Sequence, residues 1–166
     1  MLTWLGGPMA ISEAVVRELR TVLDDGDVLV ERADLIAYSI DGTWLEARPD
    51  CVVAPRTVQQ VSAVLRIADR ERIPVVPRGG ASNLSGGTIP ERGGIVLNLA
   101  QMNQIREMDT GNLLAVVEPG VLTYDLQSAV RKHNLYYPPD PSSLHQSTIG
   151  GNVAENAGGC AASSTA

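Results

Sequence analysis

The feature that most constrains this chain is a glycine-rich stretch at residues 77–87, which follows the apolar run at residues 73–76. Four glycines and three short polar side chains in eleven residues cannot pack a core, so the stretch is predicted to be a loop leaving a buried strand. Glycine allows positive φ and close approach of a ligand to the main chain, and successive N–H groups in such turns form an anion site. With the guanidinium of Arg78 beside them, these amides suit a pyrophosphate.

Two better-known phosphate motifs do not fit this stretch. A P-loop closes with Gly-Lys-Ser/Thr, but residues 77–87 contain no lysine, and a dinucleotide fingerprint passes directly into a helix. Here residues 88–94 lead instead to another apolar run. We therefore expect loop amides, and not a helix N-terminus, to bind the anion. A surface glycine loop with no ligand is the alternative.

Composition narrows the class of protein. The 166 residues, of which 44% are hydrophobic, can form one domain with a real core, and the net charge of −6 argues against a nucleic-acid surface. Cys51 and Cys160 lack any metal-ligand spacing, so no zinc site is expected, and Cys51 is interpreted as a core residue. Residues 1–8 lack a secretory pattern and no apolar run is long enough for a membrane span, so a cytoplasmic protein is expected.

Hydrophobic periodicity and capping residues predict a mixture of helices and strands, and hence the α+β class. Helices are expected from Ser12 to about residue 23, from Thr57 to about residue 71, and from residue 122 to about 134; strands are expected at residues 51–54, 75–76 and 95–99, with a hairpin at residues 105–109 and 113–117. The order strand, helix, strand indicates a small βαβ unit. Its second strand ends at the glycine loop, where ligand sites of parallel sheets commonly lie.

A second glycine-rich segment occupies residues 148–159 and follows the proline-rich residues 136–143. It carries Asn and Thr as its polar side chains and almost no charge. We interpret it as a bend lined by small residues and amides, which suits a large planar ligand with carbonyl and imide edges. A pair of tight turns plus a short surface helix, without a ligand, is the alternative.

These segments resemble a known family. Residues 78–87 resemble the pyrophosphate loop, and residues 138–143 with 148–159 the flavin loop, of FAD-linked oxidases and dehydrogenases of the vanillyl-alcohol oxidase type. Within that superfamily, with its PCMH-type FAD-binding domain, the chain looks most like the FAD-binding subunit of glycolate oxidase and the D-lactate dehydrogenases. Arg48-Pro49 and residues 55–57 match the opening strand and helix, so the resemblance covers roughly residues 35–159.

The resemblance implies a fold with a small βαβ unit plus a second mixed sheet. It also implies that residues 1–166 are the N-terminal part of one FAD-binding domain, truncated and without a substrate cap domain. The implied function is the FAD-binding portion of a flavin-dependent dehydrogenase or oxidase of glycolate or D-lactate type, with hydride transfer from the substrate to flavin N5. This chain alone would be an incomplete enzyme. The alternative is a non-catalytic flavin-domain module or fragment that functions only with a partner chain.

The same resemblance implies the cofactor site. Relatives with covalent flavin attach it to a histidine in the first loop, but Ala81 and its neighbours offer none, so the FAD should be non-covalent. His133 and His145 are interpreted as solvated residues, and no catalytic base is nominated. The implied FAD contacts are Arg78, Gly79, Gly80, Ala81, Ser82, Asn83, Leu84 and Ser85 in the first loop, and Pro139, Asp140, Ser142, Ser143, Thr148, Gly150, Gly151, Asn152, Ala154 and Gly158 in the second.

Overall fold

A computed structural model describes residues 11–159 of the chain. Cys160 and the N-terminal residues 1–8 considered above lie outside the described residues. The chain divides into two compact units. The described part of the first comprises residues 11–77 and 84–98, and that of the second comprises residues 78–83 and 99–159.

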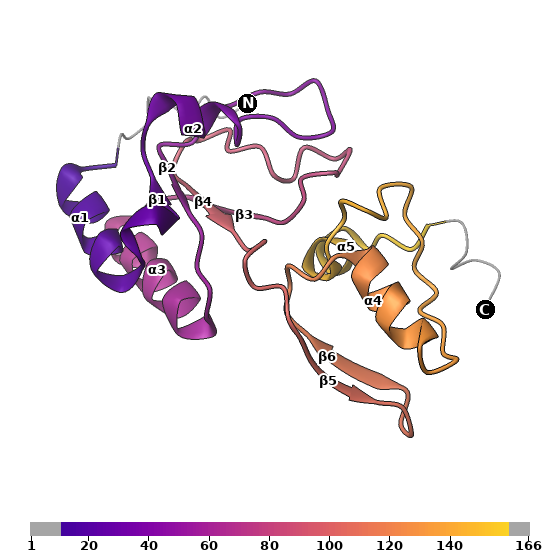
Figure 1. Cartoon of the computed structure of the whole chain (residues 1–166). Coiled ribbons are helices and arrows are strands. Elements are labelled where there is room, and N and C mark those ends of the chain that lie inside the picture. The colour runs from indigo at the N-terminus through magenta and orange to yellow at the C-terminus, as the bar shows by residue number, and fades with distance from the viewer. Residues whose placement is uncertain (1–10, 160–166) are drawn as a thin grey trace. The chain divides into compact units, whose positions relative to one another are not determined.

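The first unit is built on a four-stranded sheet in the order β1-β2-β4-β3 (Figure 1). Strand β1 (Val28–Leu29) pairs antiparallel with β2 (Cys51–Val53), and β2 pairs parallel with β4 (Ile95–Asn98). Strand β3 (Val75–Arg78) lies at the other edge, next to β4. The chain therefore leaves β2, crosses over through a helix and returns as β3, with β4 filling the position between them.

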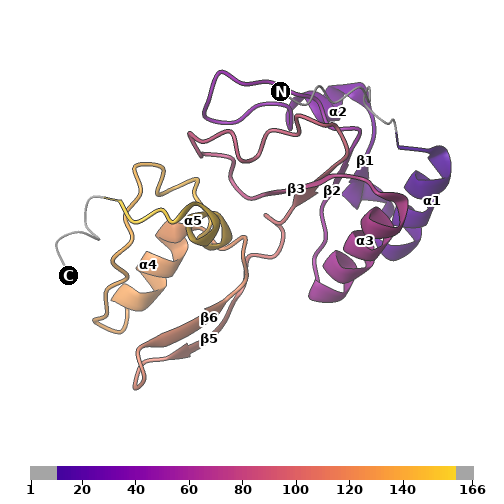
Figure 2. The same ribbon diagram turned by 180° about the vertical axis from the view of Figure 1, so that it is seen from behind.

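Helices cover both faces of this sheet, which is why every residue of β2 is buried. Helix α2 (Arg32–Ile36) lies on one face, and α1 (Glu13–Val22) and α3 (Val58–Glu71) lie on the opposite face (Figures 1 and 2). The predicted caps are present, because Ser12 Oγ accepts the Val15 N–H and Thr57 Oγ1 accepts the Gln60 N–H. Each cap fixes where its helix begins.

The second unit contains a hairpin and two helices. Strand β5 (Ile105–Asp109) pairs antiparallel with β6 (Leu114–Val117), and α4 (Thr123–Arg131) and α5 (Ile149–Glu155) follow. The core of this unit is a cluster of aliphatic residues from α4, α5 and the segment before α4, against which one face of the hairpin packs: Val121, Leu126, Val130 and Ile149, with Ile105, Met108 and Val117.

The α+β architecture predicted from the sequence is confirmed, as are the long helices, the hairpin and the βαβ connection. The second sheet was expected to be mixed, but within the described residues it is an antiparallel hairpin. The mixed sheet is the four-stranded sheet of the first unit. Cys51 is completely buried, as expected of a core residue, and burial raises the pKa of its thiol to about 12. The two-residue strand β1 and the short helix α2 have no clear sequence pattern and were not predicted.

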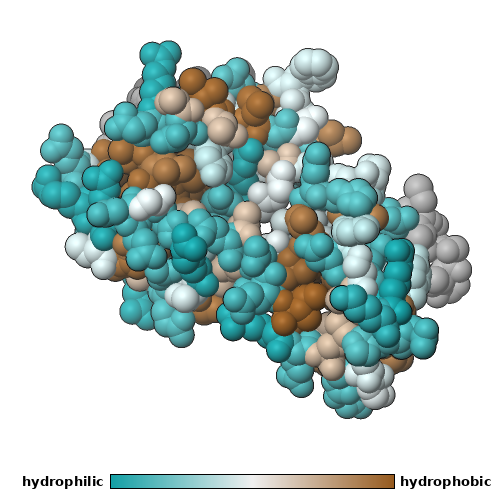
Figure 3. Space-filling view, viewed as in Figure 1, coloured by the Kyte–Doolittle hydropathy of each residue, from teal (hydrophilic) through white to brown (hydrophobic). Residues whose placement is uncertain are grey.

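Hydrophobic surface is exposed at the hairpin of the second unit (Figure 3). Leu113, Leu114 and Val116 are between 44% and 75% exposed, although they belong to an apolar run of five residues. An isolated two-stranded hairpin is only marginally stable. Here one face of the hairpin packs against the core of the second unit, and the other face is exposed. None of the helices within residues 11–159 is long and apolar enough to cross a bilayer.

Candidate functional site

The first glycine loop begins where β3 ends, at Arg78, and its residues 78–83 belong to the second unit. Its two leading glycines pass close to the segment that precedes α5. A Cβ on Gly79 would lie 2.2 Å from Thr148 Oγ1, and a Cβ on Gly80 would lie 1.9 Å from the Gln146 carbonyl oxygen. Both distances are far below van der Waals contact, so only glycine allows the two segments to meet. The structure thus brings the first loop against the start of the second glycine-rich segment.

The amides of the first loop are not used to hold the loop together. Within the described part of the chain, the N–H groups of Gly79, Gly80, Ala81 and Ser82 have no hydrogen-bond acceptor. Ala81 has φ of +51°, a left-handed conformation that a residue with a Cβ rarely adopts. Four consecutive donors without an internal partner, around a left-handed residue, are the kind of main-chain arrangement that can bind an anion.

The second glycine-rich segment differs from the bend predicted for it and contains a short helix, as in the alternative. Residues 149–155 form helix α5, whose N-cap Thr148 accepts the Gly151 N–H at 3.2 Å. The other first-turn amides are also paired, because Ile149 N–H donates to the Val121 carbonyl at 2.8 Å and Gly150 N–H to the Pro119 carbonyl at 2.9 Å. This helix start therefore has no spare donor for an anion. Its glycines serve close packing, since a Cβ on Gly150 would lie 2.7 Å from Pro119 Cβ.

The proline-rich residues 138–143 are fixed in the same way, by contacts within the unit. Gln127 Nε2 of α4 donates to the Pro139 carbonyl at 2.8 Å. Asp140 N–H donates to the Gly158 carbonyl at 2.9 Å, and Asp140 forms a parallel bridge with Gly159. The Ser143 carbonyl accepts the N–H groups of residues 146 and 147. Backbone groups in this loop are thus occupied in shaping it.

The remaining predicted contacts are distributed as follows. Asn83 is half-buried in the first loop, Ser142 and Ala154 are exposed in the second unit, and Asn152 is buried there. Leu84 and Ser85 belong to the first unit, where Leu84 is exposed and Ser85 Oγ accepts the Gly87 N–H at 3.3 Å. The structure therefore brings residues 79–80 together with Thr148 in one unit, and Leu84 and Ser85 are not part of that contact.

Sequence reasoning missed the buried polar residues that support this contact. Thr123 at the start of α4 is completely buried, and its hydroxyl bonds to Ser147 and Asn152. Gln127, on the same helix, is also buried. Both residues lie within the helix expected from residue 122, and polar residues on the inward face of an amphipathic helix were the available signal.

A buried carboxylate stabilises the segment on which α5 rests. Glu118 immediately precedes Pro119 and is 8% exposed. The Gln104 N–H donates to its carboxylate at 2.8 Å and the guanidinium of Arg106 also binds it, so the pKa of Glu118 is lowered, first by the backbone hydrogen bond and then by the arginine. The residue after Pro119 is Gly120, whose N–H donates to the Met102 carbonyl at 2.7 Å. These contacts fix the backbone that accepts the first amides of α5.

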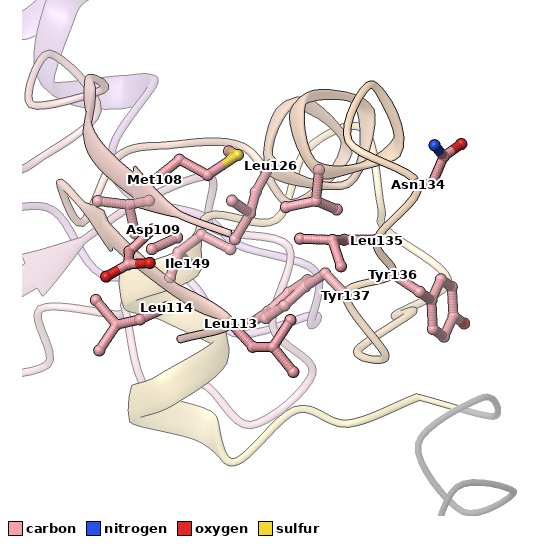
Figure 4. A pocket seen from close by; sticks show the side chains of 13 residues that line it. Met108, Asp109, Leu113, Leu114, Leu126, Asn134, Leu135, Tyr136, Tyr137 and Ile149 are labelled. Carbon is pink, nitrogen blue, oxygen red and sulfur yellow. The ribbon is translucent and has the colours of Figure 1, made fainter. Parts of the chain in front are cut away.

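A cavity of about 480 Å³ lies elsewhere in the second unit, between the hairpin and α4 (Figure 4). Its lining is mainly apolar, and Figure 4 shows Tyr137, Leu126 and Ile149 among the side chains that surround it. Burial raises the pKa of the Tyr137 phenol. Ile149 is the one residue of the second glycine-rich segment in this lining, and no residue of the first loop contributes to it. The cavity is therefore separate from the amides of the first loop.

Comparisons with known proteins agree with these features. A family model described as "FAD binding domain" matches residues 49–165. The glycolate oxidase subunit GlcD of Bacillus subtilis is 51% identical over 128 residues, which is 76% of this chain and 27% of that protein. The Escherichia coli K12 subunit of the same name is 42% identical over 147 residues, or 88% of this chain and 30% of that protein. A D-lactate dehydrogenase of Archaeoglobus fulgidus is 42% identical over 65% of this chain.

Solved structures show the same fold. Alkyldihydroxyacetonephosphate synthase superposes with a TM-score of 0.79 over 90% of this chain and 32% of that one, at 22% identity. The p-cresol methylhydroxylase with substrate bound has a TM-score of 0.76 over 89% of this chain and 30% of that one, at 28% identity. The PCMH-type fold expected from the sequence is confirmed. This chain spans about a quarter to a third of the length of the curated relatives that it matches.

The resemblance that the sequence suggested is therefore confirmed by independent comparisons. The two glycine-rich segments that carried it both fall within the matched residues. On this evidence, the chain belongs to the FAD binding domain family.

Proposed function

We propose that this chain is the FAD-binding portion of a flavin-dependent dehydrogenase or oxidase of 2-hydroxy acids. The observation that carries the proposal is the first loop, where the amides of Gly79 to Ser82 have no acceptor among residues 11–159 and the loop lies against Gln146 and Thr148. Unpaired main-chain donors at the carboxyl end of a parallel strand suit a pyrophosphate. Bound FAD would supply a hydride acceptor, at flavin N5.

The residues of the chain would bind and orient the cofactor. The loop amides and the charge of Arg78 would hold the pyrophosphate through charge-assisted hydrogen bonds. The second segment would contribute mainly its shape, because the first-turn amides of α5 are occupied. We keep the contacts predicted for it as proposals: Pro139, Asp140, Ser142, Ser143, Thr148, Gly150, Gly151, Asn152, Ala154 and Gly158. Binding would be non-covalent, since residues 77–87 contain neither histidine nor cysteine.

The substrate class follows from the relatives. Their names include glycolate oxidase subunit, D-2-hydroxyglutarate dehydrogenase and D-lactate dehydrogenase, and the acids in these names are all 2-hydroxy acids. Because this chain spans no more than about a third of those proteins, we propose that residues 1–166 are the N-terminal part of one FAD-binding domain. The substrate-binding residues would lie outside it, in a further domain or in a partner subunit.

Cofactor titration tests the proposal directly. The purified chain, at micromolar concentration, is mixed with FAD, and flavin fluorescence and the visible spectrum are recorded. We expect quenching and a perturbed spectrum, with FMN binding at least about tenfold more weakly, because FMN has no pyrophosphate to engage the loop amides. Equal affinity for FAD and FMN would contradict the loop assignment, and no binding of either would contradict a competent site.

The alternative function, a flavin-domain module that acts only with a partner chain, predicts a different result. FAD would then bind only after a second polypeptide has been added or has co-purified. The relatives named as GlcD are called subunits, which favours testing this possibility. Turnover is assayed on the FAD-loaded protein, with and without that polypeptide, using glycolate, D-lactate and D-2-hydroxyglutarate with an artificial dye acceptor.

A further inference from the structure

A buried hydrogen-bond network lies directly behind the contact between the two glycine-rich segments. Its centre is Thr123, which is completely buried at the start of α4. Its Oγ1 lies 2.8 Å from Ser147 Oγ and 3.2 Å from the Ser147 carbonyl oxygen, and Asn152 Nδ2 donates to it at 2.7 Å. Ser147 and Asn152 are each no more than 6% exposed. The network therefore joins α4, α5 and the segment between them.

The hydroxyl of Thr123 can satisfy all three contacts at once. A hydroxyl has one donor and two acceptor positions, so it can donate to the Ser147 carbonyl and accept from Ser147 Oγ and Asn152 Nδ2. The Thr123 N–H also donates to the Ser147 carbonyl, at 3.0 Å. A methyl group in place of the hydroxyl would leave buried polar atoms of two residues without this partner, which destabilises their positions.

The residues on either side of Ser147 are those that the first loop touches. Gln146 presents the carbonyl oxygen nearest to Gly80, and Thr148 presents the hydroxyl nearest to Gly79. Because neither glycine has free space beside these two residues, a displacement of Ser147 and its neighbours should also displace the first loop. The side chain of Thr123 itself is not among the nearest neighbours of either glycine.

We propose that Thr123 is a positioning residue for the pyrophosphate loop: through Ser147 it fixes residues 146–148, and these fix Gly79 and Gly80 with their amides turned to the ligand. The inference rests on the proposed function, since it names the residue that sets the geometry of that same site. Thr123 acts without touching the cofactor. Its influence passes through the buried Ser147 and through two close contacts, one of Gly80 with the Gln146 carbonyl and one of Gly79 with the Thr148 side chain.

The test compares Thr123→Val, which replaces the hydroxyl by a methyl group of similar size, with Thr123→Ser, which keeps the hydroxyl. Two readouts are used on the full chain: the FAD dissociation constant, and the amide resonances of Gly79 and Gly80 in the protein without FAD. We expect Thr123→Val to weaken FAD binding by about tenfold or more and to shift both glycine resonances. Thr123→Ser should stay within about threefold of the parent and keep both resonances in place.

Control variants separate positioning from loss of stability. Val64→Ala removes buried apolar contacts of α3 in the first unit and should lower the melting temperature without changing the FAD dissociation constant by more than about twofold. Thr21→Val makes the same chemical change at an exposed threonine of α1 and should alter neither quantity. If Thr123→Val does not fold, Ser147→Ala is measured by the same two readouts, with a loss of affinity of about threefold expected.

The outcomes distinguish this inference from the proposed function. If the parent chain binds FAD and Thr123→Val binds it equally well, with unshifted glycine resonances, the inference is overturned and the function stands. If the parent chain binds no FAD, the proposed function fails, and the glycine resonances alone decide whether Thr123 sets the loop. Shifted resonances in both Thr123→Val and Thr123→Ser would also overturn the inference, because the hydroxyl would then not be the cause.

Discussion

The two glycine-rich segments have similar compositions but use their backbones differently. In the first loop, the amides of Gly79 to Ser82 have no acceptor within the described residues, and in the second the first-turn amides of α5 are all paired. Glycine is needed in both because another backbone comes close, at Gln146 for Gly80 and at Pro119 for Gly150. The comparison teaches that a glycine-rich segment can either leave its amides unpaired or use them in packing, and that the list of hydrogen bonds separates the two cases.

The largest effect should come from Gly80→Ala. The new Cβ would lie 1.9 Å from a backbone carbonyl oxygen, which no side-chain rotation can relieve, so the loop must move away from residues 146–148. We expect FAD affinity, measured by fluorescence titration, to fall by about 100-fold or more. Gly26→Ala is the matched control, because a Cβ there meets nothing within 4 Å. Equal FAD affinities for the two variants would contradict the assignment of the first loop as the segment that binds the pyrophosphate.

A change in the second segment should act on stability. Gly150→Ala places a Cβ 2.7 Å from Pro119 Cβ and 2.9 Å from the Pro119 carbonyl oxygen. We expect the free energy of unfolding, measured by urea denaturation, to fall by about 1–3 kcal/mol, as is usual for overpacking. At Gly151 the nearest atom to a new Cβ is 3.2 Å away and belongs to a side chain. Gly151→Ala should therefore lower the free energy of unfolding by less than Gly150→Ala does. The reverse order would show that α5 does not rest on Pro119.

The left-handed residue of the first loop offers a smaller test. Ala81 has φ of +51°, which disfavours a residue with a Cβ by roughly 1–2 kcal/mol. Glycine would remove this strain but lose about 0.5–1 kcal/mol to the greater entropy of the unfolded chain. Ala81→Gly should therefore raise the free energy of unfolding by no more than about 1.5 kcal/mol, in a urea denaturation series. A clear loss of stability would show that Ala81 is not left-handed in solution.

Acid should weaken the contacts of Glu118, which stabilise the backbone on which α5 packs. The folded-state pKa of Glu118 is depressed, first by the Gln104 N–H and then by Arg106, so its carboxylate contributes stability above its unfolded pKa, roughly 4.3. That contribution is lost as the pH falls through the folded pKa. Glu118→Gln should melt a few degrees lower than the parent at pH 7, and the gap should narrow toward pH 3. A gap independent of pH would mean that ionisation of Glu118 contributes nothing.

Much of the architecture could be predicted because its signals are local. Ser12 and Thr57 cap helices that begin where expected, and the turn after Asp109 joins the two strands of a hairpin. The Asn112 side-chain amide donates to the Asp109 carboxylate at 2.7 Å, and the Asn112 and Gly111 N–H groups donate to it at 3.0 Å; these bonds lower the pKa of Asp109. Each of these devices involves residues no more than four positions apart, so a linear reading finds them.

Part of the candidate site could also be predicted, because the glycines of residues 77–87 follow an apolar run and mark a loop at the end of a strand. The prediction of a bend missed helix α5, which only the alternative included, because two glycines at its start disfavour a helix in isolation. The Thr148 cap and the bonds to the Pro119 and Val121 carbonyls stabilise the helix start. Thr123 was missed for a related reason. Its partners lie 24 and 29 residues away, and no local pattern marks a pairing at that distance.

The sequence by itself determined the long helices, the strands of the βαβ unit and the hairpin, and that a glycine-rich stretch follows β3. The tertiary structure alone decided that Gly79 and Gly80 meet residues 146 and 148, and which amides remain without an acceptor. The physical reason is that conformational preference is a property of neighbouring residues. Hydrogen-bond satisfaction, in contrast, depends on every group that folding brings close.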